Sequence, residues 1–188
     1  MLHPGGDPSI EDFLEVETGV PQGSPISPIL FLIYIRDLFS DLEEATPLSY
    51  IDDIALAVST SSYAKNARIL QKEVGRLTAT GTQQAIQFDL AKTELLHFAR
   101  SKKARQATIL LPTGETIKPA QNAVRWLGIW FDPYLNFAEH IKIRSTKALA
   151  TFNRMVRLAN LESGLSTNSL RQIYRACVNS ALDYGSPV

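Results

Sequence analysis

Two adjacent carboxylates, Asp52 and Asp53, are the residues of this sequence best suited to do chemistry. They interrupt an apolar segment, residues 46–59 (TPLSYIDDIALAVS), which predicts two strands joined by a tight turn with both carboxylates at its tip. Such a pair can approach one cation, and carboxylate oxygens suit Mg²⁺. Two such ions, about 3.5–4 Å apart, can activate a hydroxyl and stabilise a leaving phosphate. Taken alone, an Asp pair between strands is more often only a turn, where Asp is a favoured residue.

A turn and an apolar helix precede the acidic pair. Residues 19–28 (GVPQGSPISP) contain two glycines and three prolines, which predicts an ordered turn and no regular element. Ser27 is a favourable N-cap and Pro28 suits the first helical position, so a helix is predicted from there to about Asp41. Because residues 29–35 (ILFLIYI) are all apolar, this helix is expected to be buried on several faces.

Helices and short strands follow the acidic pair, which predicts an α+β fold with an antiparallel sheet and packed helices. A loop at 59–62 leads into a helix whose apolar stripe is Tyr63, Ala67, Leu70, Val74 and Leu77. Strands are predicted at 94–99, 107–111, 115–118 and 124–131, with the second and third joined by a turn at 112–114, and a further strand is predicted at 11–18.

The pattern changes to helical spacing beyond Asn136. A long helix is predicted there, with an apolar stripe formed by Phe137, Ile141, Ala148, Phe152, Met155 and Ala159. A last helix, about 167–183, follows Gly164 and is capped by Ser166. We therefore expect one α+β unit over 1–135 and a helical region over 136–188.

Composition and charge narrow the class of protein. The chain has 188 residues, 45% of them hydrophobic, and a single cysteine, Cys177, which excludes an internal disulfide scaffold and favours a reducing, intracellular compartment. The longest apolar run has seven residues, against the ~20 that span a bilayer, so no membrane association is expected. Residues 1–60 hold eleven carboxylates and one basic residue, whereas the rest of the chain is net basic. This asymmetry is typical of a cation-attracting region beside a polyanion-attracting one, although an ordinary solvated surface explains it equally well.

The order of the motifs resembles the reverse transcriptase family, most closely the polymerases of non-LTR (LINE-like) retrotransposons. Residues 19–31 (GVPQGSPISPILF) resemble motif B, and residues 49–53 (SYIDD) resemble the Tyr-x-Asp-Asp box of motif C. Residues 88–94 (FDLAKTE) are similar to motif D, and residues 126–129 (WLGI) to the motif E primer grip. Residues 137–140 and 182–187 (LDYGSP) look like the thumb of these elements. The resemblance implies a partial palm over 1–135 and a thumb-like region over 136–188.

The family resemblance implies a role for each matching residue. Asp52 and Asp53 correspond to the motif C metal ligands, so Mg²⁺ is the implied cofactor, with two ions in an intact enzyme. Tyr50, with Pro21, Gln22 and Gly23, corresponds to positions that contact the incoming nucleotide and the template. Lys92 corresponds to a lysine that helps pyrophosphate leave; a buried position at a strand edge would lower its pKa for that role, and an exposed surface lysine is the alternative. Trp126, Leu127 and Gly128 correspond to the primer-binding hairpin, and they also suit an ordinary core strand.

The implied partners are an RNA template, a DNA primer and a deoxynucleotide. Basic residues of the long helix would contact the nucleic-acid backbone, where Lys and Arg release counterions and binding depends on salt. These residues are Lys142, Arg144, Lys147, Arg154 and Arg157. A solvated helix face is the alternative for this set.

The resemblance is incomplete at its N-terminal side. A working palm needs a third carboxylate from motif A, and the only acidic candidates before motif B that lie near its place, Asp7 and Asp12, do not fit that signature. No fingers region is recognised either. We therefore expect this chain alone to be inactive and to need a fingers and motif A segment as its partner. The alternative is a non-catalytic relic, or a domesticated module that binds nucleic acid.

Overall fold

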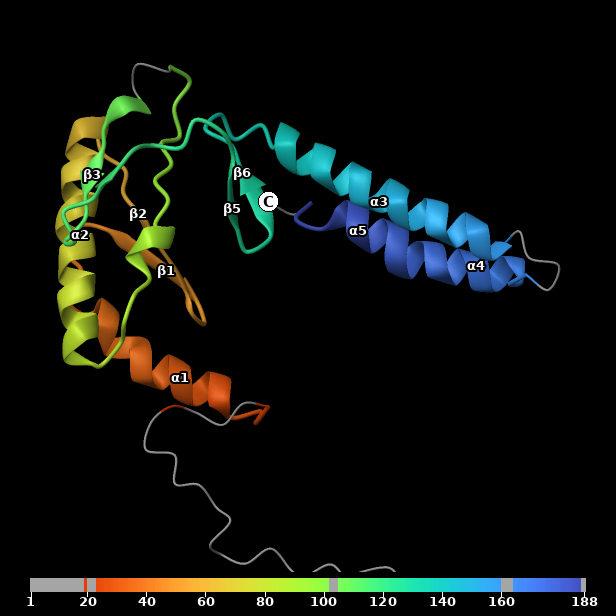
Figure 1. Cartoon of the computed structure of the whole chain (residues 1–188), viewed down its shortest axis with the longest axis horizontal. Helices are drawn as coiled ribbons and strands as arrows, with labels where there is room; N and C mark the ends of the chain where they lie inside the picture. The colour runs from red at the N-terminus through yellow and green to blue at the C-terminus, as the bar shows by residue number, and fades with distance from the viewer. Residues whose placement is uncertain (1–18, 20–22, 102–104, 160–163, 187–188) are drawn as a thin grey trace, which may run out of the picture.

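The computed structural model describes residues 19, 23–101, 105–159 and 164–186 of the chain. It is an α+β structure in which short antiparallel strand pairs and helix α2 form a body, and a pair of helical segments projects from that body as an arm (Figure 1). The predicted strand at 11–18 lies outside the described residues.

The first helix, α1 (Ser27–Ile35), runs into a 3₁₀ helix, η2 (Arg36–Phe39). The predicted cap is wrong by one residue: the N-cap is Ile26, Ser27 is the first helical residue, and Pro28 is the second. The predicted burial is wrong: within α1 only Ser27 and Ile35 are buried, and Ile29 and Ile33 are 57% and 65% exposed. The sequence pattern is that of a buried helix, but the described residues leave most of its surface without a partner.

The acidic segment forms the predicted hairpin. Strand β1 (Thr46–Tyr50) pairs antiparallel with β2 (Asp53–Ala57), from Thr46 opposite Ala57 to Tyr50 opposite Asp53. Residues 51 and 52 are left as the two-residue connection, so the carboxylates lie at the tip as predicted.

The largest helix of the body, α2 (Tyr63–Gln83), carries the core on one face. Ala67 of α2 packs with Leu95, Ile109 and Leu111, and these four side chains are the buried centre of a wider apolar cluster. The predicted stripe is confirmed, with Ala67 and Leu77 buried and the other three members half-buried. A short 3₁₀ helix, η3 (Leu90–Lys92), follows α2.

The remaining strands form two further pairs. Strand β3 (Ile109–Leu110) pairs with β4 (Thr116–Ile117), and β5 (Val124–Trp126) pairs with β6 (Ile129–Phe131). Among the described residues the three pairs do not merge into one sheet. The predicted strand at 94–99 is wrong: only Leu95 forms a bridge there, to Pro119. Alternation of apolar residues marks a half-buried segment, but it does not supply a pairing partner.

The arm consists of α3 (Ala138–Ala159) and the returning segment 167–183. That segment contains α4 (Thr167–Ile173), a π-helix, η5 (Tyr174–Asn179), and α5 (Ser180–Asp183). Its predicted bounds and cap are confirmed, because the hydroxyl of Ser166 accepts the backbone N–H of Ser169 at 3.2 Å. The predicted stripe of α3 is wrong at Ile141 and Phe152, which are 58% and 38% exposed, although Ala148 is buried. No helix in the described part of the chain is long and apolar enough to span a bilayer.

Candidate functional site

The tip of the β1–β2 hairpin presents Asp52 and Asp53 to solvent. Asp53 begins β2 opposite Tyr50, so these two side chains share one face of the hairpin, and Asp52 lies in the turn beside them. All three residues are exposed. Ile51, the other turn residue, has a φ of 55°, a backbone conformation that is an outlier for a β-branched residue. Such outliers cluster at functional sites.

The two carboxylates are available to a cation. Neither forms an ion pair or a side-chain hydrogen bond with any residue that the structure describes. Their oxygens are hard ligands of the kind that Mg²⁺ prefers, and two acidic ligands with water completing the shell are typical of its protein sites. No cluster of three or more His, Cys, Asp or Glu side chains that could hold a metal occurs among the described residues. The pair therefore fits part of a divalent-cation site.

The glycine-rich turn before α1 is described only in part. Gly23 is exposed and has a φ of 86°, a left-handed conformation that suits glycine. It precedes a turn in which the backbone N–H of Ser27 donates to the carbonyl of Ser24 at 3.2 Å. Pro21 and Gln22 lie outside the described residues.

Lys92 does not have the environment that would lower its pKa. It ends the 3₁₀ helix η3, its side chain is 83% exposed, and its Nζ lies 2.8 Å from the carboxylate of Asp89. The hydrogen bond and the charge of Asp89 raise the pKa of Lys92 above its usual 10.5. The expectation of a buried lysine at a strand edge is therefore wrong, and the exposed alternative is the one observed.

Trp126, Leu127 and Gly128 form the end of the β5–β6 hairpin. Trp126 pairs with Ile129, and the two-residue turn between them has φ values of 47° at Leu127 and 80° at Gly128. A two-residue turn with positive φ at both residues is a type I′ turn, and its twist matches the twist of the two strands that it joins. All three predicted residues are half-buried, so the turn is neither a core strand nor a fully solvated tip.

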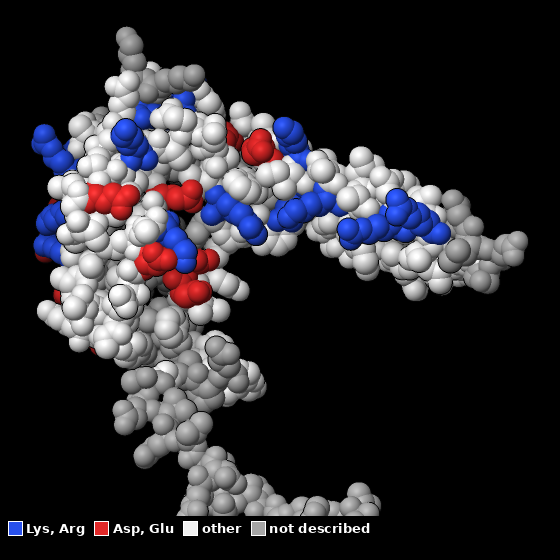
Figure 2. Space-filling model, in the orientation of Figure 1, with Lys and Arg blue, Asp and Glu red and all other residues white. Residues whose placement is uncertain are grey.

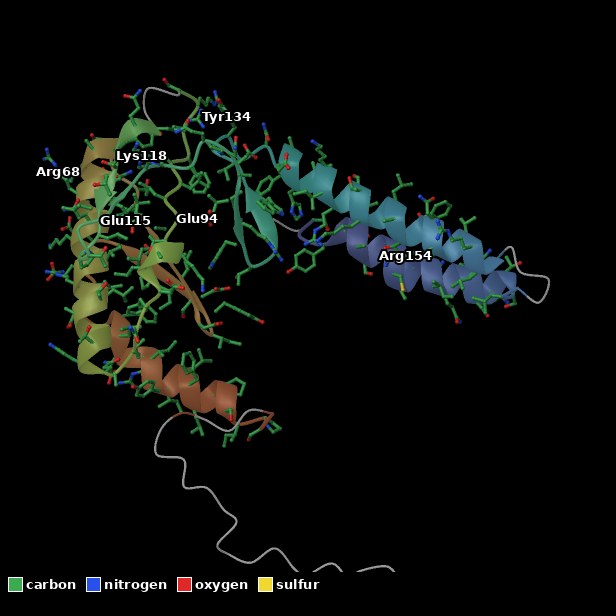
Figure 3. The ribbon with its side chains drawn as sticks, in the orientation of Figure 1. Arg68, Glu94, Glu115, Lys118, Tyr134 and Arg154 are labelled. Carbon is green, nitrogen blue, oxygen red and sulfur yellow. The ribbon has the colours of Figure 1, made fainter. Side chains whose placement is uncertain are left out.

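The basic residues of the arm fall into two groups. Lys142, Lys147, Arg154 and Arg157 are exposed, whereas Arg144 is half-buried and donates to the carbonyl oxygen of Gly128 at 2.9 Å. Helix α3 carries these five basic residues against one acidic residue, Glu139. Figure 2 shows Lys and Arg in a row along the arm, with Asp and Glu gathered over the body. Figure 3 labels Arg154 on α3.

Three further residues shape this region, and no individual role was predicted for any of them, although His140 and Tyr184 lie in the two segments that resemble the thumb. The carboxylate of buried Asp132 accepts the backbone N–H groups of Tyr134, Asn136 and Phe137, which fixes the entry to α3. His140 accepts the N–H of Trp130 at 3.4 Å, so its Nε2 carries the proton and donates to the carbonyl of Tyr184 at 2.8 Å. Asp132 follows a strand and precedes a helix, the signal of a capping residue. The contacts of His140 and Tyr184 span 44 residues and leave no local signal.

Comparison with known families gives one match. The profile described as "Reverse transcriptase (RNA-dependent DNA polymerase)" matches residues 7–131. This range includes the β1–β2 hairpin, η3 and the β5–β6 hairpin, and it ends before the arm.

Curated relatives match almost the whole chain. The "Probable RNA-directed DNA polymerase from transposon BS" of Drosophila melanogaster is 27% identical over 177 residues, which are 90% of this chain and 19% of that protein. The "RNA-directed DNA polymerase from mobile element jockey" of the same species is 26% identical over 186 residues, covering 92% of this chain and 19% of the relative. The chain thus spans about a fifth of the length of these relatives. No solved structure matches this chain.

Proposed function

The chain belongs to the reverse transcriptase (RNA-dependent DNA polymerase) family, and from this membership we propose that it is the part of such a polymerase that carries two metal-binding carboxylates and holds the primer–template duplex. The observation that carries the proposal is the place of Asp52 and Asp53, adjacent and exposed at the tip of the β1–β2 hairpin. The similarity of the flanking regions to RNA-directed DNA polymerases supports the same assignment.

Asp52 and Asp53 are the residues proposed to hold Mg²⁺. When bound, the metal activates an attacking hydroxyl and stabilises a leaving phosphate. The fit is partial, since no third acidic ligand joins the pair among the described residues. We therefore propose that a further carboxylate, from a motif A segment, completes the site in a longer polymerase, and that this chain alone does not extend a primer.

Tyr50 and Lys92 are both proposed to contact the nucleotide. The ring of Tyr50 shares a hairpin face with Asp53 and is exposed, so it can pack against an incoming nucleotide or the primer end. Lys92 is an exposed cation whose ordinary pKa of 10.5 already keeps it protonated at neutral pH, and Asp89 raises that pKa further. A cation of this kind can neutralise the charge of a departing pyrophosphate. Separately, Pro21, Gln22 and Gly23 are proposed to contact the template and the nucleotide.

The arm is proposed to bind the backbone of the duplex. Lys147 and Arg154 are seven residues apart on α3 and share one face, with Arg157 three residues further along. Exposed basic side chains in such a row neutralise phosphates, release counterions and bind without regard to sequence. The hairpin turn at Trp126, Leu127 and Gly128 lies at the root of the arm and is proposed to contact the primer.

The remaining part of the polymerase is proposed to cover α1. This helix leaves apolar side chains exposed, although its composition is that of a buried helix. An apolar face of this kind marks an interaction site. Since the chain spans only 19% of its relatives' length, the fingers and motif A segment of a longer polymerase is the partner that we propose for this face.

A chimera tests the catalytic proposal. The chain replaces the matching fifth of the transposon BS polymerase, and RNA-templated primer extension is measured with Mg²⁺. We expect extension, and Asp52→Asn should reduce it by at least about a hundredfold, because the lost ligand acts on the transition state. Glu115→Gln is the matched control, since Glu115 is also an exposed carboxylate and has no part in the proposed site, and it should retain most of the activity. A chimera that binds the duplex without extending the primer would contradict the proposal that Asp52 and Asp53 belong to a catalytic metal site.

Non-catalytic binding of nucleic acid is the second candidate function. It is favoured by the five basic residues of α3 combined with the lack of a third acidic ligand among the described residues. Titration of the chain with a labelled RNA–DNA duplex at several salt concentrations discriminates the two. Binding that falls with salt, and that Asp52→Asn leaves unchanged with and without Mg²⁺, favours this second candidate.

A further inference from the structure

The turn of the β5–β6 hairpin is held by two side chains from the arm. The hydroxyl of Tyr184 donates to the carbonyl of Leu127 at 2.9 Å, and Nη2 of Arg144 donates to the carbonyl of Gly128 at 2.9 Å. The Arg144 guanidinium carbon lies 4.0 Å from the centre of the Tyr184 ring. The two donors therefore support each other as well as the turn. We refer to Arg144 and Tyr184 as the turn clamp.

Glycine at position 128 is required for this contact. A Cβ added there would lie 3.0 Å from the Tyr184 hydroxyl oxygen and 3.2 Å from its Cε1. The φ of 80° at the same residue also favours glycine. Because both the backbone conformation and the space depend on glycine, the turn and Tyr184 are fitted to one another.

His140 holds the backbone of Tyr184, one of the two clamp residues. Its Nε2 donates to the carbonyl of Tyr184 at 2.8 Å, and its Nδ1 accepts the backbone N–H of Trp130 at 3.4 Å. His140 is buried, and it belongs to α3, while Trp130 belongs to β6. The hairpin, α3 and the end of the returning segment are thereby linked through one side chain.

The clamp also changes the charge that the turn presents. A free carbonyl oxygen carries partial negative charge and would repel a phosphate, and a two-residue turn exposes two of them. Here both carbonyls are occupied by donors, and one of these donors is a cation. A turn whose carbonyls are neutralised in this way is suited to lie against a nucleic-acid backbone.

We propose that Arg144 and Tyr184 are positioning residues that fix the β5–β6 turn to the arm, so that both contact the primer–template duplex as one rigid unit. Arg144 thus acts through the turn and does not itself bind a phosphate, in contrast to the exposed basic residues of α3. This inference rests on the proposed function, because it assumes that the turn and the arm bind a duplex.

The test uses the full chain and a fluorescent RNA template–DNA primer duplex, with affinity measured at several salt concentrations. Tyr184→Phe removes one hydroxyl and no charge, and we expect about three- to tenfold weaker binding with an unchanged salt slope. Arg144→Lys keeps the charge but loses the stacking and the fork, and it should behave in the same way. Arg154→Gln, the control, should lower the salt slope by about one. The double variant Tyr184→Phe/Arg144→Lys should bind little more weakly than either single variant.

Two results would overturn the inference, and a third would overturn the function beneath it. Arg144→Gln is compared directly with Arg154→Gln. If the salt slope of binding falls by about one in both variants, and Tyr184→Phe binds like the unchanged chain, Arg144 is a direct phosphate contact. Unchanged amide exchange at Leu127 and Gly128 in Tyr184→Phe would show that the clamp does not fix the turn. Failure of the unchanged chain to bind any duplex would instead refute the proposed function.

Discussion

Tyr50 and Asp53 are the last cross-strand pair of the β1–β2 hairpin, which places a phenol ring and a carboxylate side by side on one face next to the turn. Asp52 adjoins them as a turn residue, so two like charges lie next to each other with no cation from the described residues to offset them. A divalent cation bound at the hairpin tip would offset both charges.

Removing either carboxylate at the hairpin tip should weaken the binding of a divalent cation. Mn²⁺ is the probe, since it takes the same oxygen ligands as Mg²⁺ and broadens nearby NMR resonances. Asp52→Asn or Asp53→Asn should reduce Mn²⁺ affinity by about tenfold or more, the loss that even indirect support of a metal ligand produces. Asp89→Asn should leave broadening at the hairpin unchanged. Broadening that persists at residues 50–53 in both tip variants would contradict the assignment.

Replacing Ile51 by glycine should stabilise the chain. Ile51 has a φ of 55°, and holding a residue in such a conformation costs about 1–3 kcal/mol. Glycine adopts it freely, at an entropic cost of about 0.5–1 kcal/mol, so we expect the free energy of unfolding in urea to rise by about 1 kcal/mol. The control is Ala55→Gly, in strand β2, which should lower that free energy by about 0.5–1 kcal/mol. Loss of stability in Ile51→Gly would show that the turn is not strained.

The Asp89–Lys92 pair should make the ionisation of each partner depend on the other. Asp89 raises the pKa of Lys92 above 10.5, and Lys92 lowers the pKa of Asp89 below 3.8. Stabilisation from Lys92 is therefore present below pH 10.5 and is lost as the pH rises through its higher folded value. Stabilisation from Asp89 is present above pH 3.8 and is lost as the pH falls through its lower folded value. In Asp89→Asn, an NMR titration of the Lys92 side chain should return a pKa near 10.5; an unchanged, raised value would contradict the pairing.

The buried carboxylate of Glu73 should depend on Arg76. Glu73 is fully buried, one of its oxygens lies 3.5 Å from Nη1 of Arg76, and the other has no hydrogen-bond partner among the described residues. Arg76→Met leaves this carboxylate unpaired, which should lower the free energy of unfolding by about 1–3 kcal/mol. Glu73→Met/Arg76→Met should recover most of that loss, because apolar side chains replace buried ion pairs well.

The control for this pair is Lys72→Met on the same helix. Among the described residues, Lys72 forms ion pairs only with the exposed carboxylates of Glu43 and Glu44, so its removal should cost no more than about 1 kcal/mol. If the double variant is less stable than Arg76→Met alone, the carboxylate of Glu73 contributes favourably without its partner, and the prediction is wrong.

Features encoded within a few residues could be predicted from the sequence. The hairpin with Asp52 and Asp53 at its tip follows from two apolar runs around a polar pair, and the cap at Ser166 follows from one residue type at one position. The same holds for the stripe of α2, because its spacing repeats from Tyr63 to Leu77, about four turns of helix.

Features that depend on distant partners could not be predicted in the same way. The Leu95–Pro119 bridge needs a segment 24 residues away, and no local pattern distinguishes it from a full strand. Arg144 cannot be told from its exposed basic neighbours on α3 by sequence pattern. Its guanidinium nevertheless donates to the carbonyl of Gly128 and stacks on the ring of Tyr184. Lys92 differs in that its partner Asp89 is only three residues earlier; what could not be predicted there is the 83% exposure of the Lys92 side chain, because exposure depends on how distant segments pack.

The exposed face of α1 should make the chain associate with itself. Ile29 and Ile33 are 57% and 65% exposed on one helix, four residues apart, and contiguous apolar surface of this kind favours association. Ile29→Lys/Ile33→Glu should shift the chain towards the monomer in sedimentation velocity and change the free energy of unfolding by no more than about 0.5 kcal/mol, as expected for surface positions. Ile35→Glu, at a residue that is 3% exposed, is the contrasting variant and should destabilise α1 and its packing against the body. Within a longer polymerase the same double substitution should instead lower stability, because the partner proposed for α1 would then cover both positions; equal tolerance in both contexts would leave α1 without a partner and refute that assignment.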